Sequence, residues 1–590
     1  MRAVSRARAR ATPRAARAGG DTNRLSRRLR RRGGDDRRPT RRARAHGGDD
    51  DAMRRAVKDA RIERAREGDS EVQEEEEAVA VSASASDVAF DALSVAVQMP
   101  AIEHARAVFR DRGSTEFFEP GKSRDLIERF IEREEMNEFE VAVSACTVKE
   151  AKCSTCKTGY SDVVLLQAFD WLSTKRSLHS DKSYYRRIED RVPMIADFGF
   201  THVWLPPPSL SVDEHGYMPS EIYNLNASEY GDEAELKSLV HVLKKAGIAA
   251  VCDIVINHRC AEYASDGRFI SFADEITPSG RRINWGAYAI VGDDPFFREG
   301  QGANDSGDSI EIAPDLDHTN AEIREAIIEW LNWLKDDIGF SGWRFDFVQG
   351  YAPSFVREYV EKTVGFEQFC VGENWVGMTW SESFLEYNQD KPRRVLVDWL
   401  NAADECAALF DFVTKGILQE AVKRVEFWRL RDQQGGMPGL AGWVPQSAVT
   451  FLDNHDTGYP QNHWPFPLDR LGLGYAYTLL HPGIPCVFGP HIWCCDENLG
   501  WSESLPKEIR ALLSLRKLAN VCCESRVDIK IAESDLYVAF IDDKLLVKLG
   551  PRYDVPSEIL AQVAEFELAT HGDDYAVWIR KELLEQPFAE

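Results

Sequence analysis

Eight short apolar runs alternate with amphipathic stretches between residues 161 and 520, and this alternation leaves few folds open to the chain. The stretches between the runs have helical spacing, as in 322–335, where Ile323, Ile327 and Leu331 fall on one face. Continuous apolar strands separated by helices are typical of parallel sheets covered on both faces. The pattern therefore predicts an α/β fold, a (β/α)8 TIM barrel. The eight runs span 163–169, 202–205, 249–256, 342–348, 369–373, 409–413, 448–452 and 484–488.

Two further regions break the barrel pattern. Residues 258–319, which follow the third run, are rich in Gly, Asp and Asn and are too long for an ordinary loop, so we expect a functional loop or an inserted subdomain there. After residue 520 the apolar residues alternate with a period of two, which predicts a C-terminal antiparallel β domain over 521–590. Its strands are expected at 528–532, 535–541, 544–549, 563–567 and 575–579.

The N-terminal 64 residues differ in charge from the rest of the chain. They carry a net charge of +14, against −39 for the remainder and −25 overall. Residues 1–48 hold 17 Arg and three acidic residues, a composition typical of an organellar transit peptide and also of a disordered basic tail. Residues 65–160 remain uncertain, and Cys146, Cys153 and Cys156 there could be a zinc site, a redox pair or ordinary reduced cysteines.

Charge and hydropathy exclude some classes of partner. A body this acidic is not expected to bind nucleic acid through phosphate contacts. The sequence contains no uncharged apolar stretch of the length that a membrane-spanning helix needs, so no membrane partner is expected.

Polar and ionisable residues recur where the predicted strands end. Asp253 lies in the third run, Asp346 in the fourth and Glu373 in the fifth, and Asp456 follows the seventh. Barrel enzymes place their chemistry at the C-terminal ends of strands, so these carboxylates should converge. A carboxylate inside a buried strand is costly unless it is paired. A pair of carboxylates at one barrel mouth is the arrangement that glycosidic bond cleavage uses.

Several segments resemble plant-type members of the α-amylase family, glycoside hydrolase family 13, over about residues 161–583. The stretches 388–390 and 397–401 are more similar to the plastid branch than to the secreted enzymes. The resemblance implies an endo-acting hydrolase of α-1,4-glucosidic bonds that works with retention. The segments are THVWLPPP at 201–208, GYMP at 216–219, NHRCA at 257–261, TKGIL at 414–418, NHDTG at 454–458 and GPRYD at 550–554.

The resemblance also assigns roles to individual residues. Asp346 would be the nucleophile, Glu373 the general acid/base and Asp456 the carboxylate that stabilises the transition state. Arg344, two residues before Asp346, should face the same side of the strand and stabilise its carboxylate. Gln349 stands where many family members carry Lys, which leaves affinity for sugar beyond the cleaved bond open. The substrate-binding positions implied are Tyr217, His258, Arg344, Gln349, Trp375, His455 and Gln461.

The resemblance identifies the segment 258–319 as the family's inserted domain B, and it implies calcium as the cofactor. The side chains of Asn257, Asp305 and Asp315 would bind it, with backbone carbonyls of Asp308 and Gly350. Oxygen ligands of this kind suit a hard cation such as Ca²⁺.

The expected partners are starch, amylopectin and malto-oligosaccharides, and the expected location is the plastid (chloroplast), with the cytoplasm as the alternative. Two other functions remain open at this point. One is a related transglycosylase or debranching enzyme. The other is a non-catalytic starch-binding or regulatory protein on an amylase scaffold, although all three catalytic carboxylates are present.

Overall fold

The structure is a computed structural model that describes residues 160–175, 181–265, 267–493 and 502–585. Our predictions for residues 1–64 and 65–159 lie outside the described residues. Eight parallel strands close into a barrel in the order β1-β16-β15-β14-β11-β10-β5-β2, which confirms the predicted fold class. The strands are β1 Leu165–Gln167, β2 His202–Leu205, β5 Ala249–Ile254, β10 Gly342–Phe345, β11 Cys370–Gly372, β14 Ala408–Phe410, β15 Ala448–Thr450 and β16 Ile484–Phe488.

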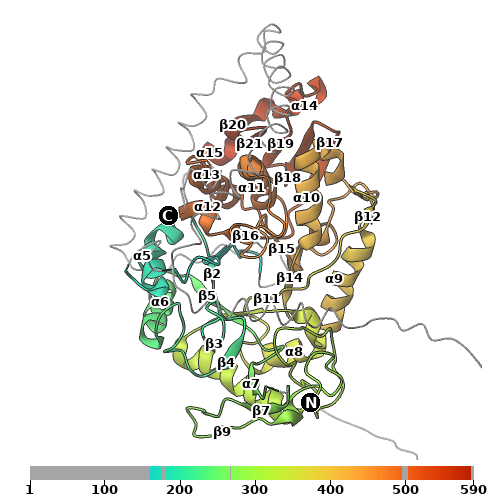
Figure 1. The fold of residues 1–590 in the computed structure, drawn as a ribbon. Helices are drawn as coiled ribbons and strands as arrows, with labels where there is room; N and C mark the ends of the chain where they lie inside the picture. The colour runs from blue at the N-terminus through green and yellow to red at the C-terminus, as the bar shows by residue number, and fades with distance from the viewer. Residues whose placement is uncertain (1–159, 176–180, 266, 494–501, 586–590) are drawn as a thin grey trace, which may run out of the picture. The chain divides into compact units, whose positions relative to one another are not determined.

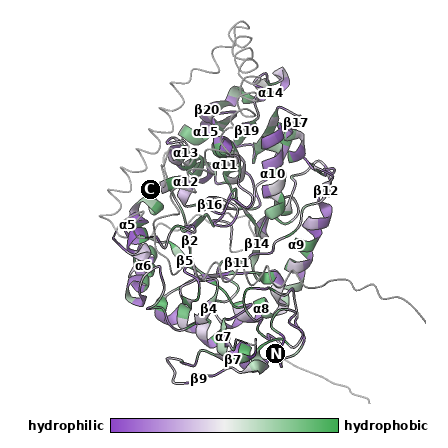
Figure 2. Cartoon of the chain, in the orientation of Figure 1, coloured by the Kyte–Doolittle hydropathy of each residue, from purple (hydrophilic) through white to green (hydrophobic). Residues whose placement is uncertain are grey.

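Helices follow the strands in alternation and lie outside them (Figure 1). In α6, Asp232 and Glu235 form a capping box at the N-terminus, and Leu236, Leu239 and Leu243 are buried on one face. Helices α5, α6 and α9 carry both hydrophilic and hydrophobic residues, as amphipathic helices on a barrel do (Figure 2). The barrel helices are α5 Tyr184–Asp197, α6 Glu233–Lys245, α7 Ala321–Trp333, α8 Pro353–Lys362, α9 Asp390–Ala402, α10 Phe412–Arg424, α11 Leu471–Leu480 and α13 Leu505–Leu518.

The long segment between β5 and α7 contains two small antiparallel pairs. Strand β6 Ala261–Tyr263 pairs with β7 Phe269–Phe272, and β8 Glu275–Ile276 pairs with β9 Arg282–Ile283. A buried ion pair between Arg259 and Glu275, 2.6 Å apart, links the start of this segment to its second hairpin. The inserted domain B of the predicted fold class is therefore present.

The C-terminal part forms a five-stranded antiparallel sheet in the order β17-β18-β19-β21-β20. Both of its faces are buried, because Ala539 and Ile541 of β18 join the main core while Val538 and Phe540 join a second apolar cluster. The predicted strand at 563–567 was wrong: 563–565 is a 3-10 turn, and β20 extends to Gly572, where a tight turn leads into β21. The strands are β17 Val527–Ala532, β18 Tyr537–Ile541, β19 Leu545–Leu549, β20 Phe566–Gly572 and β21 Tyr575–Arg580.

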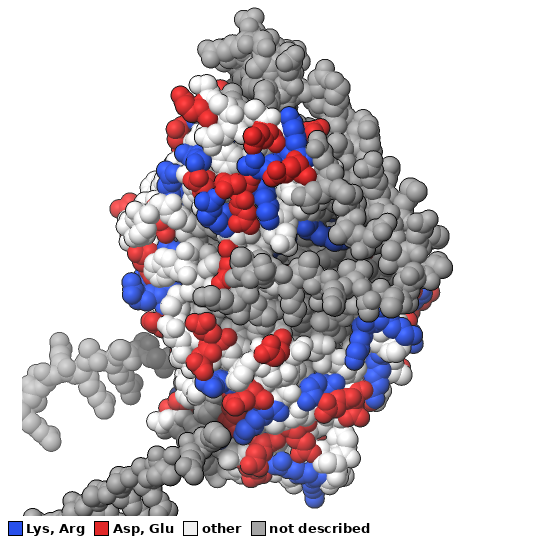
Figure 3. Space-filling view, turned by 180° about the vertical axis from the view of Figure 1, so that it is seen from behind, with Lys and Arg blue, Asp and Glu red and all other residues white. Residues whose placement is uncertain are grey.

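The surface shows mixed charge. On the face drawn in Figure 3, acidic and basic side chains lie interspersed in small groups over the described part of the chain. Within the ranges that the structure describes, no helix has the length and apolar character needed to cross a bilayer.

Candidate active site

The predicted catalytic carboxylates lie at one end of the barrel. Asp346 and Glu373 directly follow β10 and β11, and Asp456 lies in the loop after β15. Their backbones continue the strand pairing, because Asp346 N donates to Ile254 O at 3.1 Å and Glu373 N donates to Phe345 O at 3.0 Å. The chain then turns sharply, with Phe347 at a φ of 44°. The backbone hydrogen bonds between barrel strands therefore fix the positions from which these two side chains extend.

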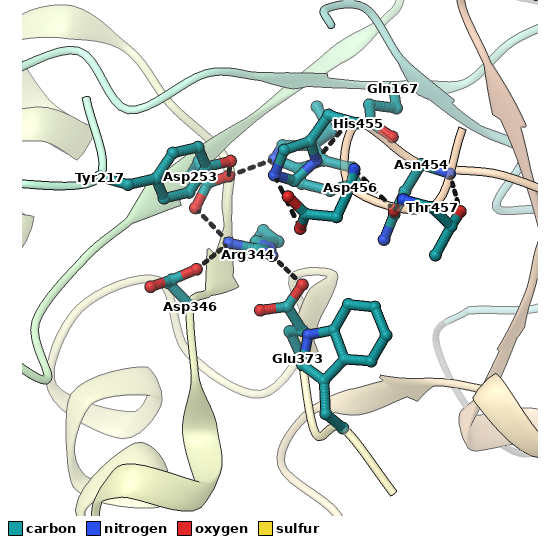
Figure 4. Close-up of polar contacts among 12 residues, drawn as sticks. Gln167, Tyr217, Asp253, Arg344, Asp346, Glu373, Asn454, His455, Asp456 and Thr457 are labelled. Atoms are coloured by element: carbon teal, nitrogen blue, oxygen red, sulfur yellow. Dashed lines mark hydrogen bonds and ion pairs between the residues drawn. The ribbon is translucent and has the colours of Figure 1, made fainter. Parts of the chain in front are cut away.

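Arg344 is the centre of the site (Figure 4). Its side chain is fully buried, and its Nη1 lies 2.6 Å from Asp346 Oδ1 and 2.9 Å from Asp253 Oδ1. Its Nη2 lies 2.6 Å from Glu373 Oε1. One guanidinium thus holds three carboxyl groups from three neighbouring strands, which the barrel order β11-β10-β5 brings side by side.

The charges of the site do not balance when every carboxyl group is ionised. Asp253, Asp346, Glu373 and Asp456 face a single guanidinium, that of Arg344. Burial raises the pKa of Glu373, and the Asp346 and Asp456 carboxylates add to this, although Arg344 opposes it. We therefore infer that this cluster retains a proton and that the Glu373 carboxyl group carries it.

Aromatic rings form one wall of the site. Tyr217 stacks on His455 with ring centroids 5.2 Å apart and an interplanar angle of 5°. Tyr217 also donates from its hydroxyl to Asp253 Oδ2 at 2.7 Å. Burial lowers the pKa of His455 to about 4, so its ring is neutral at ordinary pH. A flat, uncharged stack of this kind can support the face of a sugar ring.

Several site residues carry buried polar atoms that have no hydrogen-bond partner among the described residues, and two of these belong to His258 and Gln167. His258 Nε2 hydrogen-bonds Tyr217 O at 2.8 Å, while His258 Nδ1 has no partner within the described ranges. Gln167 Nε2 contacts His455 Nδ1 at 2.8 Å, while Gln167 Oε1 is likewise unpaired there. Buried polar atoms are rarely left unsatisfied, so these two are suited to substrate hydroxyls.

The loop that carries His455 and Asp456 is held by its own side chains. Asn454 Oδ1 accepts hydrogen bonds from Asp456 N at 3.0 Å and from Thr457 N at 2.9 Å. His455 Nε2 lies 3.3 Å from Asp456 Oδ2. The Asp456 carboxylate, 22% exposed, therefore faces the opening of the site from a fixed backbone.

The remaining predicted sugar-binding residues differ in their placement. Gln349 Oε1 accepts a hydrogen bond from Trp375 N at 2.8 Å, so this side chain holds the segment after Glu373. The Trp375 ring packs on Phe412, with centroids 4.2 Å apart. Gln461 is exposed on the loop after Asp456.

The predicted metal-binding residues come together beside the β10 end. Asn257 Nδ2 donates to Asp315 Oδ1 at 2.8 Å. The 305–308 segment is tied to the turn after Asp346, because Asp308 N donates to Gln349 O at 2.9 Å. The turn is crowded, since a Cβ added at Gly350 would lie 2.0 Å from Asn257 Oδ1.

Two observations favour a cation there. Asn257 Oδ1 and Asp305 Oδ2 are buried without a hydrogen-bond partner among the described residues. Burial raises the pKa of Asp315 to about 8, with Asp305 and Asp294 adding to it, as expected for carboxylates that lack a counter-ion. The described residues contain no group of three or more His, Cys, Asp or Glu side chains arranged for a metal, and the predicted set has only two such carboxylates.

Sequence reasoning gave no role to Asp253, although it noted this acid in an apolar strand. Asp253 is fully buried and accepts hydrogen bonds from Trp204 Nε1 and Tyr217 Oη as well as from Arg344. Gln167 was also missed. A polar residue inside the first apolar run was the available signal for it.

Comparisons with known proteins place the chain among the amylases. A family model described as "Alpha amylase, catalytic domain" matches residues 175–275, and one described as "Alpha-amylase C-terminal beta-sheet domain" matches residues 518–579. The chain is 41% identical over 422 residues to "Alpha-amylase 3, chloroplastic" of Arabidopsis thaliana, a match that covers 71% of this chain and 44% of that protein. It is also 41% identical over 415 residues to "Probable alpha-amylase 2" of Arabidopsis thaliana, covering 70% of this chain and 93% of that protein.

A solved structure supports the fold. The α-amylase from Malbranchea cinnamomea matches with a TM-score of 0.50 at 16% identity, covering 72% of this chain and 98% of that chain. At this level of identity the likeness concerns the fold alone.

Proposed function

The chain belongs to the α-amylase family of glycoside hydrolases, and from this membership we propose that it is an endo-acting α-amylase that cleaves α-1,4-glucosidic bonds with retention. It is a starch-hydrolysing enzyme of that family. Its proposed substrates are starch, amylopectin and malto-oligosaccharides. The chain spans 44% of the length of the chloroplastic relative.

The proposed reaction has two displacements. The Asp346 carboxylate attacks the anomeric carbon, the bond to the glycosidic oxygen breaks, and Glu373 donates its proton to that oxygen. This forms a glycosyl ester on Asp346. Glu373 then takes a proton from water, whose oxygen attacks the same carbon and releases the Asp346 carboxylate. Two inversions restore the α configuration, and Glu373 ends the cycle protonated.

The observation that carries this proposal is the pairing of Asp346 and Glu373 with the two amino groups of the Arg344 guanidinium. One side chain thereby holds the nucleophile and the acid beside the same point in space. The carboxylate of Asp456 and the stacked Tyr217 and His455 rings would bind the sugar at the cleavage point.

Proton NMR of the first products tests the proposal. The enzyme should release the α-anomer of malto-oligosaccharides before mutarotation and should produce chains of mixed length from soluble starch. Release of the β-anomer first would refute retention, and release of a single short product from chain ends would refute endo action.

The residues at the β10 end fit the calcium that is typical of the family. Carboxylate oxygens of Asp305 and Asp315, the amide oxygen of Asn257 and carbonyls of Asp308 and Gly350 would hold it. When bound, the ion supplies charge neutralisation and a crosslink between the 305–315 segment and the turn after β10. The carboxylates and Arg344 would carry out the bond cleavage itself.

We extend the proposal to location and domain limits. The chloroplastic relative and the Arg-rich residues 1–48 support import into a plastid. A reporter fused to residues 1–64 should enter plastids, and a cytosolic reporter would refute this. We propose a catalytic barrel over 161–520, with domain B at about 258–319, and a C-terminal β domain over 521–590.

A further inference from the structure

A fully buried lysine on α10 has no part in the proposed chemistry. Lys415 is the fourth residue of α10, and its side chain has no exposed surface. Its Nζ donates to Gln419 Oε1 at 2.7 Å and to Trp464 O at 2.8 Å. It also lies 3.6 Å from Asp453 Oδ1, a carboxylate that is 1% exposed. A buried cation of this kind is costly unless an opposite charge and hydrogen bonds compensate for its lost hydration.

The contacts of Lys415 join the two ends of one loop. Asp453 is where the loop begins after β15, and Trp464 is close to where it ends. The Asp453 carboxylate also accepts hydrogen bonds from Phe466 N, at 3.1 Å to Oδ1 and 3.3 Å to Oδ2. The buried pair therefore closes the base of the loop 453–466.

The same pair is connected to the catalytic part of that loop. Asp453 Oδ1 accepts a hydrogen bond from Thr457 Oγ1 at 3.1 Å, and Thr457 Oγ1 accepts one from Asn454 N at 3.0 Å. Asn454 Oδ1 in turn accepts the backbone N–H of Asp456. Three hydrogen bonds therefore connect Asp453 to the backbone of Asp456 by way of Thr457 and Asn454.

Helix α10 packs directly on the far end of the loop. A Cβ added at Gly416 would lie 2.8 Å from Trp464 Cη2, so only glycine allows the indole ring this close. The Lys415 ammonium lies 4.7 Å from the centre of the same ring. Burial lowers the pKa of Lys415 to about 8, and the neighbouring Asp453 carboxylate opposes that shift.

We propose that Lys415 and Asp453 form a positioning pair that sets the Asp456 carboxylate against the substrate. The inference rests on the proposed function, because it concerns the residue that would stabilise the transition state. Neither member of the pair touches substrate; both act through the backbone of the loop 453–466. Misplacement of a group at the reacting centre by about 1 Å can cost roughly 100-fold in rate.

The test compares the parent, the Lys415→Met/Asp453→Asn double variant, the Asp456→Asn variant and the triple variant on malto-oligosaccharide. Removing both charges leaves no uncompensated buried ion, which protects the fold. We expect kcat and kcat/KM of the double variant to fall together by about 10- to 100-fold, as for a lost transition-state interaction. In the Asp456→Asn background, the same change should cost less than about threefold, because residues that act as a unit are not additive.

A matched control is the Arg393–Asp432 ion pair, 3.1 Å apart, in which Asp432 also accepts loop N–H groups. Asp432→Asn should lower the melting temperature and leave kcat within about twofold. If the double variant does not fold, Lys415→Gln/Asp453→Asn, which also removes both charges and keeps a polar side chain at each position, takes its place.

Full kcat in the folded double variant, or losses that add to that of Asp456→Asn, would overturn the positioning role. A parent that releases no reducing ends would instead refute the proposed function. The two failures are therefore distinguishable.

Discussion

Arg344 Nη2 lies 2.6 Å from Glu373 Oε1, although the proposed role of Glu373 requires it to hold a proton. The guanidinium favours the carboxylate, whereas burial and the neighbouring acids favour the carboxylic acid. The second influence is the larger, so the pKa of Glu373 is raised. This balance is the physical basis of the pH prediction that follows.

Activity should fall on the alkaline side as Glu373 loses its proton. Because the pKa of Glu373 is raised above its ordinary value, kcat should stay high through neutral pH and decline as the pH passes that raised pKa. Initial rates between pH 5 and pH 10 would check this. An alkaline limb that persists unchanged in a Glu373→Gln variant with residual activity would assign it to another group.

Removal of Arg344 should destabilise the fold as well as abolish turnover. Arg344→Met would leave Asp253 buried without its cation, and breaking a buried ion pair in this way costs about 3–5 kcal/mol in the free energy of unfolding. Urea unfolding followed by circular dichroism measures this. An Arg344→Met/Asp253→Asn variant should recover part of the loss, and no recovery would contradict the assignment of the cost to Asp253.

Calcium removal should lower thermal stability. An ion that binds only the folded state stabilises it, so excess EDTA should reduce the melting temperature by several degrees, and added Ca²⁺ should restore it. Asp315→Asn should weaken the response, because Asp315 supplies one of the two proposed carboxylates. A melting temperature that EDTA leaves unchanged would refute the calcium site.

Two histidines away from the site should make the protein sensitive to acid. Burial lowers the pKa of His202 to about 4 and that of His481 to about 3, against an ordinary value of about 6.5. Below about pH 6.5 these histidines bind protons in the unfolded state but not in the folded state. The free energy of unfolding therefore falls by about 1.4 kcal/mol per histidine per pH unit, until the pH reaches the folded-state pKa values. Unfolding free energies at pH 7 and pH 5 would show it.

A non-titrating replacement serves as the control for that prediction. His481→Gln removes one titrating group that donates to or accepts from Tyr537 Oη at 2.9 Å. The variant should be less stable at pH 7 and should lose less stability between pH 7 and pH 5 than the parent. An equal loss in both would show that His481 does not contribute.

The sequence was sufficient for the barrel because eight mostly apolar strands alternate along the chain with amphipathic helices. It failed at 563–567, where apolar residues form a turn and the strand begins with Phe566. The bounds of β20 depend on its pairing with β21 and on the turn after Gly572. The alternation of apolar residues along the chain predicts neither of these.

For the site, a family resemblance named the residues but could not provide their contacts. Asp253 was visible as an acid in an apolar strand, yet its bonds to Arg344, Tyr217 and Trp204 depend on which strands are neighbours. The Lys415–Asp453 pair joins residues of two different barrel segments, and nothing in their spacing along the chain predicts it.

Reducing-end release from soluble starch by the full chain and by Glu373→Gln tests the central claim most directly. With Ca²⁺ present, the parent should release malto-oligosaccharides of mixed length, and the variant should be slower by a factor of about 1,000 or more while still binding the glucan. A variant that keeps the parent's rate, or a folded parent that releases nothing, would contradict the account.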